Sequence, residues 1–123
     1  MHILYASKTG NVRRFIVKTG FSALCIDENP LVEQPFVLVT YTTGFGQVPD
    51  QVTQFLQRNH RFLFAVAASG NKNWGEGFAR SADIIAEKYG VPILCKFEMS
   101  GTKGDVEIFN ERMRGIEETV ETY

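Results

Sequence analysis

The sequence contains few of the residues that build metal and disulfide sites. Its 123 residues include only two cysteines, Cys25 and Cys95, and two histidines, His2 and His60. The cysteines form no C-x-x-C pair, and neither has a histidine beside it at a ligand spacing. We therefore expect no metal site. Because each cysteine lies inside an apolar run, we interpret both as small buried side chains.

A charge of one sign and a long apolar run are also missing. The 13 basic and 14 acidic residues give a net charge of −1, which argues against a nucleic-acid partner. No apolar run approaches the roughly 20 residues that cross a bilayer. The first residues enter a strand-like run at once without a secretory signal, so we expect a cytoplasmic protein with no membrane partner. Residues 1–123 are expected to form a single domain.

Strand-like and helix-like segments alternate along the chain. The predicted strands cover residues 2–6, 23–26, 35–41, 62–68 and 91–97. Such alternation predicts an α/β fold with a parallel sheet and right-handed crossovers. Five strands of this length fit a flavodoxin-like three-layer sandwich with the strand order 2-1-3-4-5.

This strand order makes further predictions about individual strands. The most apolar run, residues 62–68, should be central, and Pro92 fits an edge strand. The second and fifth strands are then opposite edges, about four strand spacings or roughly 19 Å apart. Because a disulfide needs much closer Cα atoms, Cys25 and Cys95 should not be bonded to each other.

A polar turn, Ser7 to Val12, connects the first strand to the first helix. Backbone N–H groups are free at a helix N-terminus, where the helix dipole favours an anion. Ser7 and Thr9 add hydroxyl donors, and Gly10 allows close approach of a ligand. The turn therefore indicates a phosphate site, although it is neither a Walker loop nor the three-glycine dinucleotide pattern. The alternative is that Thr9 or Asn11 only caps the helix.

Two more polar turns, residues 42–48 and 69–75, follow the third and fourth strands. Ligands bind beyond the carboxyl ends of parallel strands, where the strand order reverses, so all three turns should meet there. Each of these two turns has one aromatic residue, Phe45 or Trp74, and a planar ring system between them would explain both. The alternative is that each aromatic ring packs on its own neighbouring helix.

The three turns together resemble those of the NrdI family, flavodoxin-like proteins that serve class Ib ribonucleotide reductase. The resemblance is carried by the turn from Ser7 to Asn11 and by residues 39–49. It is tightest in residues 66–75, from Val66 to Gly75, continues through residues 78–79 and 91–94, and covers essentially the whole chain.

The resemblance implies FMN as cofactor and two partners, a dimanganese small subunit of class Ib ribonucleotide reductase and an electron-donating reductase. In that family the reduced flavin reacts with dioxygen. Superoxide or a related oxidant then reaches the partner's metal site, where a manganese–tyrosyl radical cofactor is assembled. The implied cofactor-binding residues are Ser7, Lys8, Thr9, Gly10, Asn11 and Val12 in the first turn, Thr42, Thr43, Gly44, Phe45 and Gly46 in the second, and Ser69, Gly70, Asn71, Trp74 and Gly75 in the third.

The residues of the second and third turns bear on the redox chemistry of such a flavin. The peptide at Gly44 could flip toward the flavin N5 without a Cβ clash, although Gly44 and Gly46 could also simply form a tight turn. The two turns contain no Asp or Glu, and Lys72 adds positive charge, which should ease reduction of the flavin.

No side chain in the turns is a clear acid or base, so the chemistry is expected at FMN itself. Two alternatives stay open. They are a small electron-transfer flavodoxin that serves another reductase, and a non-redox module that binds a phosphate or a nucleotide.

Overall fold

A computed structural model describes residues 1–44 and 46–122, with side chains described as far as Glu117. Its sheet contains β1 (His2–Tyr5), β2 (Leu24–Cys25), β3 (Phe36–Tyr41), β4 (Leu63–Gly70) and β5 (Ile93–Glu98). Neighbouring strands are parallel, in the order β2-β1-β3-β4-β5. The predicted fold class and strand order are confirmed.

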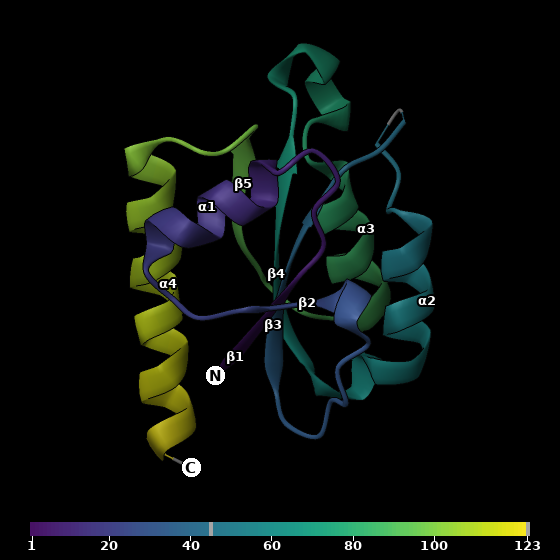
Figure 1. Cartoon of the computed structure of the whole chain (residues 1–123). Coiled ribbons are helices and arrows are strands. Elements are labelled where there is room, and N and C mark those ends of the chain that lie inside the picture. The colour runs from purple at the N-terminus through teal and green to yellow at the C-terminus, as the bar shows by residue number, and fades with distance from the viewer. Residues whose placement is uncertain (45, 123) are drawn as a thin grey trace.

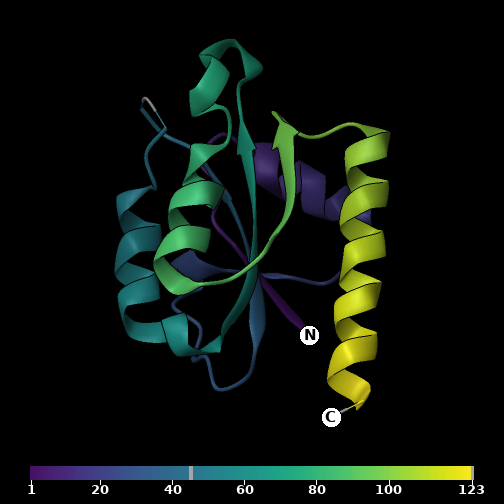
Figure 2. The ribbon, with the colours of Figure 1, turned by 180° about the vertical axis from the view of Figure 1, so that it is seen from behind.

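Helices cover both faces of this sheet. The α-helices are α1 (Asn11–Thr19), α2 (Asp50–Asn59), α3 (Arg80–Tyr89) and α4 (Lys103–Thr122), and the short 3-10 helices are η1 (Ile26–Glu28), η2 (His60–Phe62) and η3 (Lys72–Gly77). In Figures 1 and 2, α1 and α4 lie on one side of the sheet and α2 and α3 on the other. The result is the predicted three-layer sandwich.

Each face of the sheet buries its own apolar cluster. On the α1 and α4 face, the rings of Phe15 and Phe97 stack with centroids 3.8 Å apart, and Phe109 meets Phe15 edge-on at 5.4 Å. On the α2 and α3 face, Phe36 and Phe55 meet edge-on at 5.9 Å. Each aromatic pair of this kind stabilises the fold by about 0.5–1.5 kcal/mol beyond the burial of its rings. Helix packing on both faces therefore stabilises the sheet.

Two details differ from the sequence predictions, the central strand and the burial of Cys25, whereas the edge position next to Pro92 is as predicted. β4 is an interior strand, but the middle position belongs to β3, because β4 lies between β3 and β5. Pro92 directly precedes the edge strand β5, and its carbonyl accepts a hydrogen bond from Val66 N–H. Cys95 is buried, whereas Cys25 is only half-buried, because β2 is a short strand at the open edge of the sheet.

The thiols of Cys25 and Cys95 are both free, and they lie on the opposite edge strands β2 and β5. Within residues 1–44 and 46–122, none of the helices combines the length and the apolar character that a membrane span requires.

Candidate functional site

A cavity of about 240 Å³ opens at the carboxyl ends of the strands. It is lined by Ser7, Lys8, Thr9, Asn11, Val12, Tyr41, Thr42, Thr43, Gly44, Gly46, Ser69, Gly70, Asn71, Trp74, Gly77 and Met99. These residues lie at or after the carboxyl ends of β1, β3, β4 and β5, and β1 and β3 are the strands between which the order reverses. Parallel α/β sheets bind their ligands at this position.

The three turns that the sequence singled out therefore meet at one cavity. Of the candidate residues, Gly10 and Gly75 do not line it, and Phe45 lies outside the described residues. Sequence reasoning missed Tyr41, Gly77 and Met99. Tyr41 and Met99 could have been found, because each stands at or just after the carboxyl end of a strand, at the same edge of the sheet as the turns.

The first turn contains an unsatisfied donor. Ser7 Oγ is buried and has no hydrogen-bond partner among the described residues. A buried hydroxyl without a partner costs about 1–3 kcal/mol. Since Ser7 lines the cavity, a ligand oxygen or nitrogen placed there would satisfy this group.

The start of α1 argues against the alternative that Thr9 or Asn11 only caps the helix. Gly10 is the N-cap, with φ +89°, and neither Thr9 nor Asn11 caps the helix with its side chain. No acidic residue occupies the first turn of α1 either. Among the described residues, no side-chain cap accepts from the N-terminus of α1. Free N–H groups and the positive end of a helix dipole suit an anion.

Asn11 belongs to a small polar network instead. Its Oδ1 accepts hydrogen bonds from Arg14 Nη2 at 2.7 Å and from Ser100 Oγ at 3.0 Å. Arg14 Nε also donates to Ser100 Oγ at 3.1 Å. The network links the first turn of the site to the turn between β5 and α4.

The second turn is a tight one. Thr43 and Gln47 exchange backbone hydrogen bonds of 2.9 and 2.8 Å, which closes the turn around Gly44 and Gly46. Both glycines have positive φ values, +56° and +99°. Since this backbone region strongly favours glycine, the turn itself requires them. A peptide flip at Gly44 remains a prediction.

The third turn packs closely on its surroundings. A Cβ on Gly70 would lie 2.4 Å from the backbone N of Ala79, so only glycine fits there. Asn71 Oδ1 accepts a hydrogen bond from Asn73 N–H at 2.9 Å, which shapes the start of η3. Trp74 lies on η3, is 47% exposed and lines the cavity.

A carboxylate lies closer to the third turn than the sequence suggested. Lys72 N–H donates to Glu98 Oε2 at 2.9 Å. Glu98 ends β5 and is distant from Lys72 in the sequence, so inspection of the turns alone could not place it there. The turns themselves still contain no acid, but the Glu98 carboxylate adds negative charge beside the third turn.

The lining of the cavity also contains a phenol, that of Tyr41. Burial raises the pKa of Tyr41 above its ordinary value, and the nearby Asp27 carboxylate raises this pKa further. Tyr41 is therefore neutral at physiological pH and can donate a hydrogen bond. In the described part of the chain, no group of three or more His, Cys, Asp or Glu residues could hold a metal ion.

Comparisons with known proteins identify similar sequences. A family model described as "NrdI Flavodoxin like" matches residues 3–111. The chain is 47% identical to Protein NrdI of Macrococcus caseolyticus, with all of both chains covered. It is 49% identical to Protein NrdI of Bacillus licheniformis, with 94% of this chain and 89% of that protein covered.

Solved structures show the same fold at low sequence identity. A short-chain flavodoxin associated with a non-canonical PDU bacterial microcompartment has a TM-score of 0.72 at 21% identity, with 96% of each chain covered. A Fusobacterium nucleatum flavodoxin bound to flavin mononucleotide has a TM-score of 0.63 at 15% identity, again with 96% of each chain covered.

Proposed function

Because this chain belongs to the NrdI flavodoxin-like family, we propose that it binds FMN and reduces dioxygen to superoxide or a related oxidant. The proposed recipient is the dimanganese small subunit of class Ib ribonucleotide reductase, whose manganese–tyrosyl radical cofactor the oxidant assembles. A reductase supplies the electrons. The proposed compartment is the cytoplasm, with which the free thiols of Cys25 and Cys95 agree.

One observation carries the proposal. The polar turns after β1, β3 and β4 line one cavity, and the buried Ser7 Oγ in it lacks a partner among the described residues. FMN fits these residues by chemistry, since a phosphate provides acceptors for Ser7 and for the N-terminus of α1. Its ring system is planar and matches a cavity that has the Trp74 ring at its wall.

The residues of the chain have separate tasks in this proposal. Ser7, Thr9 and the first-turn N–H groups of α1 bind the phosphate. The second and third turns would hold the ring through residues that line the cavity, namely Thr42, Thr43 and Gly44 in the second turn and Ser69, Gly70, Asn71 and Trp74 in the third. Thr42 is itself fixed, because its hydroxyl is 2.9 Å from that of Ser81 on α3. When bound, FMN supplies the exchange of electrons and the reaction with dioxygen.

A second candidate is a small electron-transfer flavodoxin that serves another reductase. The observation in its favour is Glu98, whose carboxylate accepts a hydrogen bond beside the third turn and adds negative charge near a bound flavin. Negative charge disfavours a negatively charged reduced flavin. The two one-electron potentials of the bound FMN separate the candidates, since a widely split pair with a very low second couple indicates an electron carrier.

The proposal is tested in two steps. The purified chain is first mixed with FMN, and binding is followed by absorbance and by quenching of flavin fluorescence. The FMN-loaded protein is then reduced without oxygen and exposed to oxygen with the manganese-loaded small subunit, and the tyrosyl radical is measured by EPR. We expect a radical only when both proteins and oxygen are present.

Two controls are needed to interpret the measured radical yield. Free reduced FMN with the manganese subunit measures the radical yield without this protein. Superoxide dismutase, added to the complete mixture, shows whether the oxidant passes through bulk water. A chain that binds no FMN would contradict the whole proposal, whereas FMN binding without radical formation would favour the electron carrier.

A further inference from the structure

The turn between β5 and α4, residues 99–102, contacts two of the turns that line the cavity. At one end, Met99 N–H donates to the Gly70 carbonyl at 3.1 Å, and the Met99 carbonyl accepts from Ser69 Oγ at 2.7 Å. Met99 holds this position with φ +54°, which is uncommon for a residue with a side chain. The turn is therefore anchored to the carboxyl end of β4.

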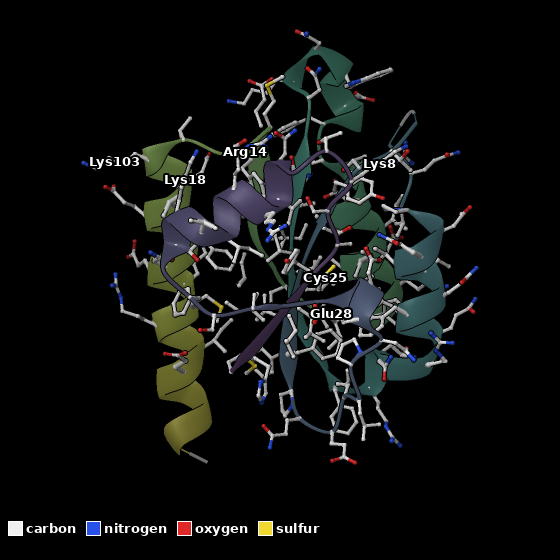
Figure 3. The ribbon with its side chains drawn as sticks, in the orientation of Figure 1. Lys8, Arg14, Lys18, Cys25, Glu28 and Lys103 are labelled. Carbon is white, nitrogen blue, oxygen red and sulfur yellow. The ribbon has the colours of Figure 1, made fainter. Side chains whose placement is uncertain are left out.

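Its other end is anchored to α1 by two basic side chains one helical turn apart. Lys18 Nζ donates to the carbonyls of Ser100 and Gly101 at 3.3 and 3.1 Å, and Arg14 Nε donates to Ser100 Oγ. Figure 3 shows Arg14 and Lys18 on α1 beside the chain that leads into α4. A Cβ on Gly101 would lie 2.5 Å from the Phe15 ring, so the backbone of the turn lies directly on α1.

Asn11 is the point at which this anchoring reaches the cavity. Arginine can only donate hydrogen bonds, so the atom of the Asn11 carboxamide that faces Arg14 must be its oxygen. Ser100 Oγ binds the same oxygen, and the two donors fix the carboxamide in one orientation. The nitrogen, with two N–H donors, then lies on the other side of the group, and Asn11 lines the cavity.

We propose that Arg14 and Ser100 are positioning residues that hold the Asn11 amide nitrogen ready for a phosphate, and that they thereby set the preference for FMN over riboflavin. Riboflavin has the same ring system and lacks the phosphate. The inference rests on the proposed function, since it concerns the same cavity. It assigns a role to Ser100, which does not line the cavity itself although its neighbour Met99 does.

The test compares affinities for the two flavins. Dissociation constants for FMN and riboflavin are measured by fluorescence quenching for the full chain and for Arg14→Gln and Ser100→Ala. We expect FMN binding to weaken about tenfold in Arg14→Gln and about threefold in Ser100→Ala, because a freely rotating amide contributes less to a charge-assisted hydrogen bond. Riboflavin binding should change less than twofold in both variants.

Matched variants separate positioning from charge and from stability. Arg13→Gln removes the same charge from the neighbouring exposed position of α1, which takes no part in the network, and should leave the FMN-to-riboflavin ratio close to that of the unaltered chain. Ser100→Thr keeps the hydroxyl and should restore the ratio that Ser100→Ala lowers. Circular dichroism checks that each variant is folded, and Ser100→Ala decides the question if Arg14→Gln does not fold.

The outcomes distinguish the two proposals. An unaltered chain that binds no FMN overturns the proposed function and this inference together. FMN binding with a ratio that Ser100→Ala leaves unchanged overturns the inference alone, as does an equal loss in Arg13→Gln and Arg14→Gln. A loss of affinity for both flavins alike would show that the network only supports the fold.

Discussion

The interior of the sheet and its carboxyl rim differ in whether their polar groups have hydrogen-bond partners. In β3, residues from Phe36 to Val39 are 0% exposed, and the strand pairs with β1 and β4. At the rim, Ser7 Oγ is buried without a partner among the described residues, and Gly44 and Gly46 have positive φ values. The comparison indicates that the interior stabilises the fold. The rim contributes less to stability, because its buried Ser7 hydroxyl has no partner among the described residues until a ligand binds.

The largest effect should follow a change in the interior. Phe36→Ala removes a fully buried ring that packs on Phe55, and we expect the free energy of unfolding to fall by about 3–5 kcal/mol in urea titrations. FMN affinity at low denaturant should change little, because Phe36 begins β3 and the cavity lies at its other end. A variant of normal stability that binds no FMN would break the comparison.

The buried thiol of Cys95 makes the stability of the protein depend on pH. Burial, and to a lesser extent the Asp105 carboxylate, raises the pKa of Cys95 from an ordinary value of 9.0 to about 11, while Arg112 acts in the opposite direction. Between pH 9 and 11 the thiol keeps its proton in the folded state and loses it in the unfolded state. The contribution of the thiol to the free energy of unfolding is therefore complete below pH 9 and is lost between pH 9 and 11. At about 1.4 kcal/mol per pH unit, the loss is about 2–3 kcal/mol.

The measurement is urea unfolding at several pH values for the unaltered chain and Cys95→Ala. The stability of the variant should fall less steeply over this range, because the variant lacks the Cys95 thiol. Parallel curves would mean that the Cys95 thiol ionises as easily in the folded state as in the unfolded one.

At the rim, Gly70→Ala should lower both stability and FMN affinity. The added Cβ would lie 2.4 Å from the Ala79 backbone, so β4 or the start of α3 must move, at a cost of about 1–3 kcal/mol. Gly115→Ala is the matched control, because no atom of the described residues lies within 4 Å of its added Cβ in the exposed part of α4. It should raise stability by up to about 1 kcal/mol and leave FMN binding unchanged.

A pair of serines should give effects of opposite sign on the ligand-free protein. Ser7→Ala removes the unsatisfied hydroxyl, so stability should stay constant or rise by up to about 1 kcal/mol, while FMN binding weakens about tenfold. Ser69→Ala removes a hydroxyl that donates to the Met99 carbonyl and should lower stability by about 1 kcal/mol. Thermal melts without FMN, together with fluorescence titrations, measure both quantities.

The smallest effect concerns the potential of the bound flavin. Gly44→Val should hinder a peptide flip toward the flavin N5 and lower the first one-electron potential by a few tens of millivolts, where a tenfold change in the equilibrium corresponds to about 59 mV. Gly20→Val introduces similar backbone strain at φ +79° at the end of α1, outside the cavity, and should leave the potential unchanged. A potential unaffected by Gly44→Val would argue that the glycine serves the turn alone.

The sequence by itself determined the sheet order and the three turns of the cavity. Strands such as Phe36–Tyr41 are continuous apolar runs, and the periodicity of the helices between them leaves few possible topologies. Because the carboxyl ends of parallel strands share one edge, Ser7, Thr42 and Ser69 had to meet once the order was known. The family could also be predicted from the sequence, because its motifs are continuous runs of residues.

Only the tertiary structure revealed the contacts between distant residues. Arg14 and Ser100 are 86 positions apart, and Lys72 meets the carboxylate of Glu98 across 26 positions. Such polar contacts depend on side-chain directions at the end of β5, and no periodicity in the sequence encodes these directions. Hydrophobic patterns determine which faces are buried, whereas the pairing of individual donors and acceptors is decided only when the packed elements bring them within hydrogen-bond distance.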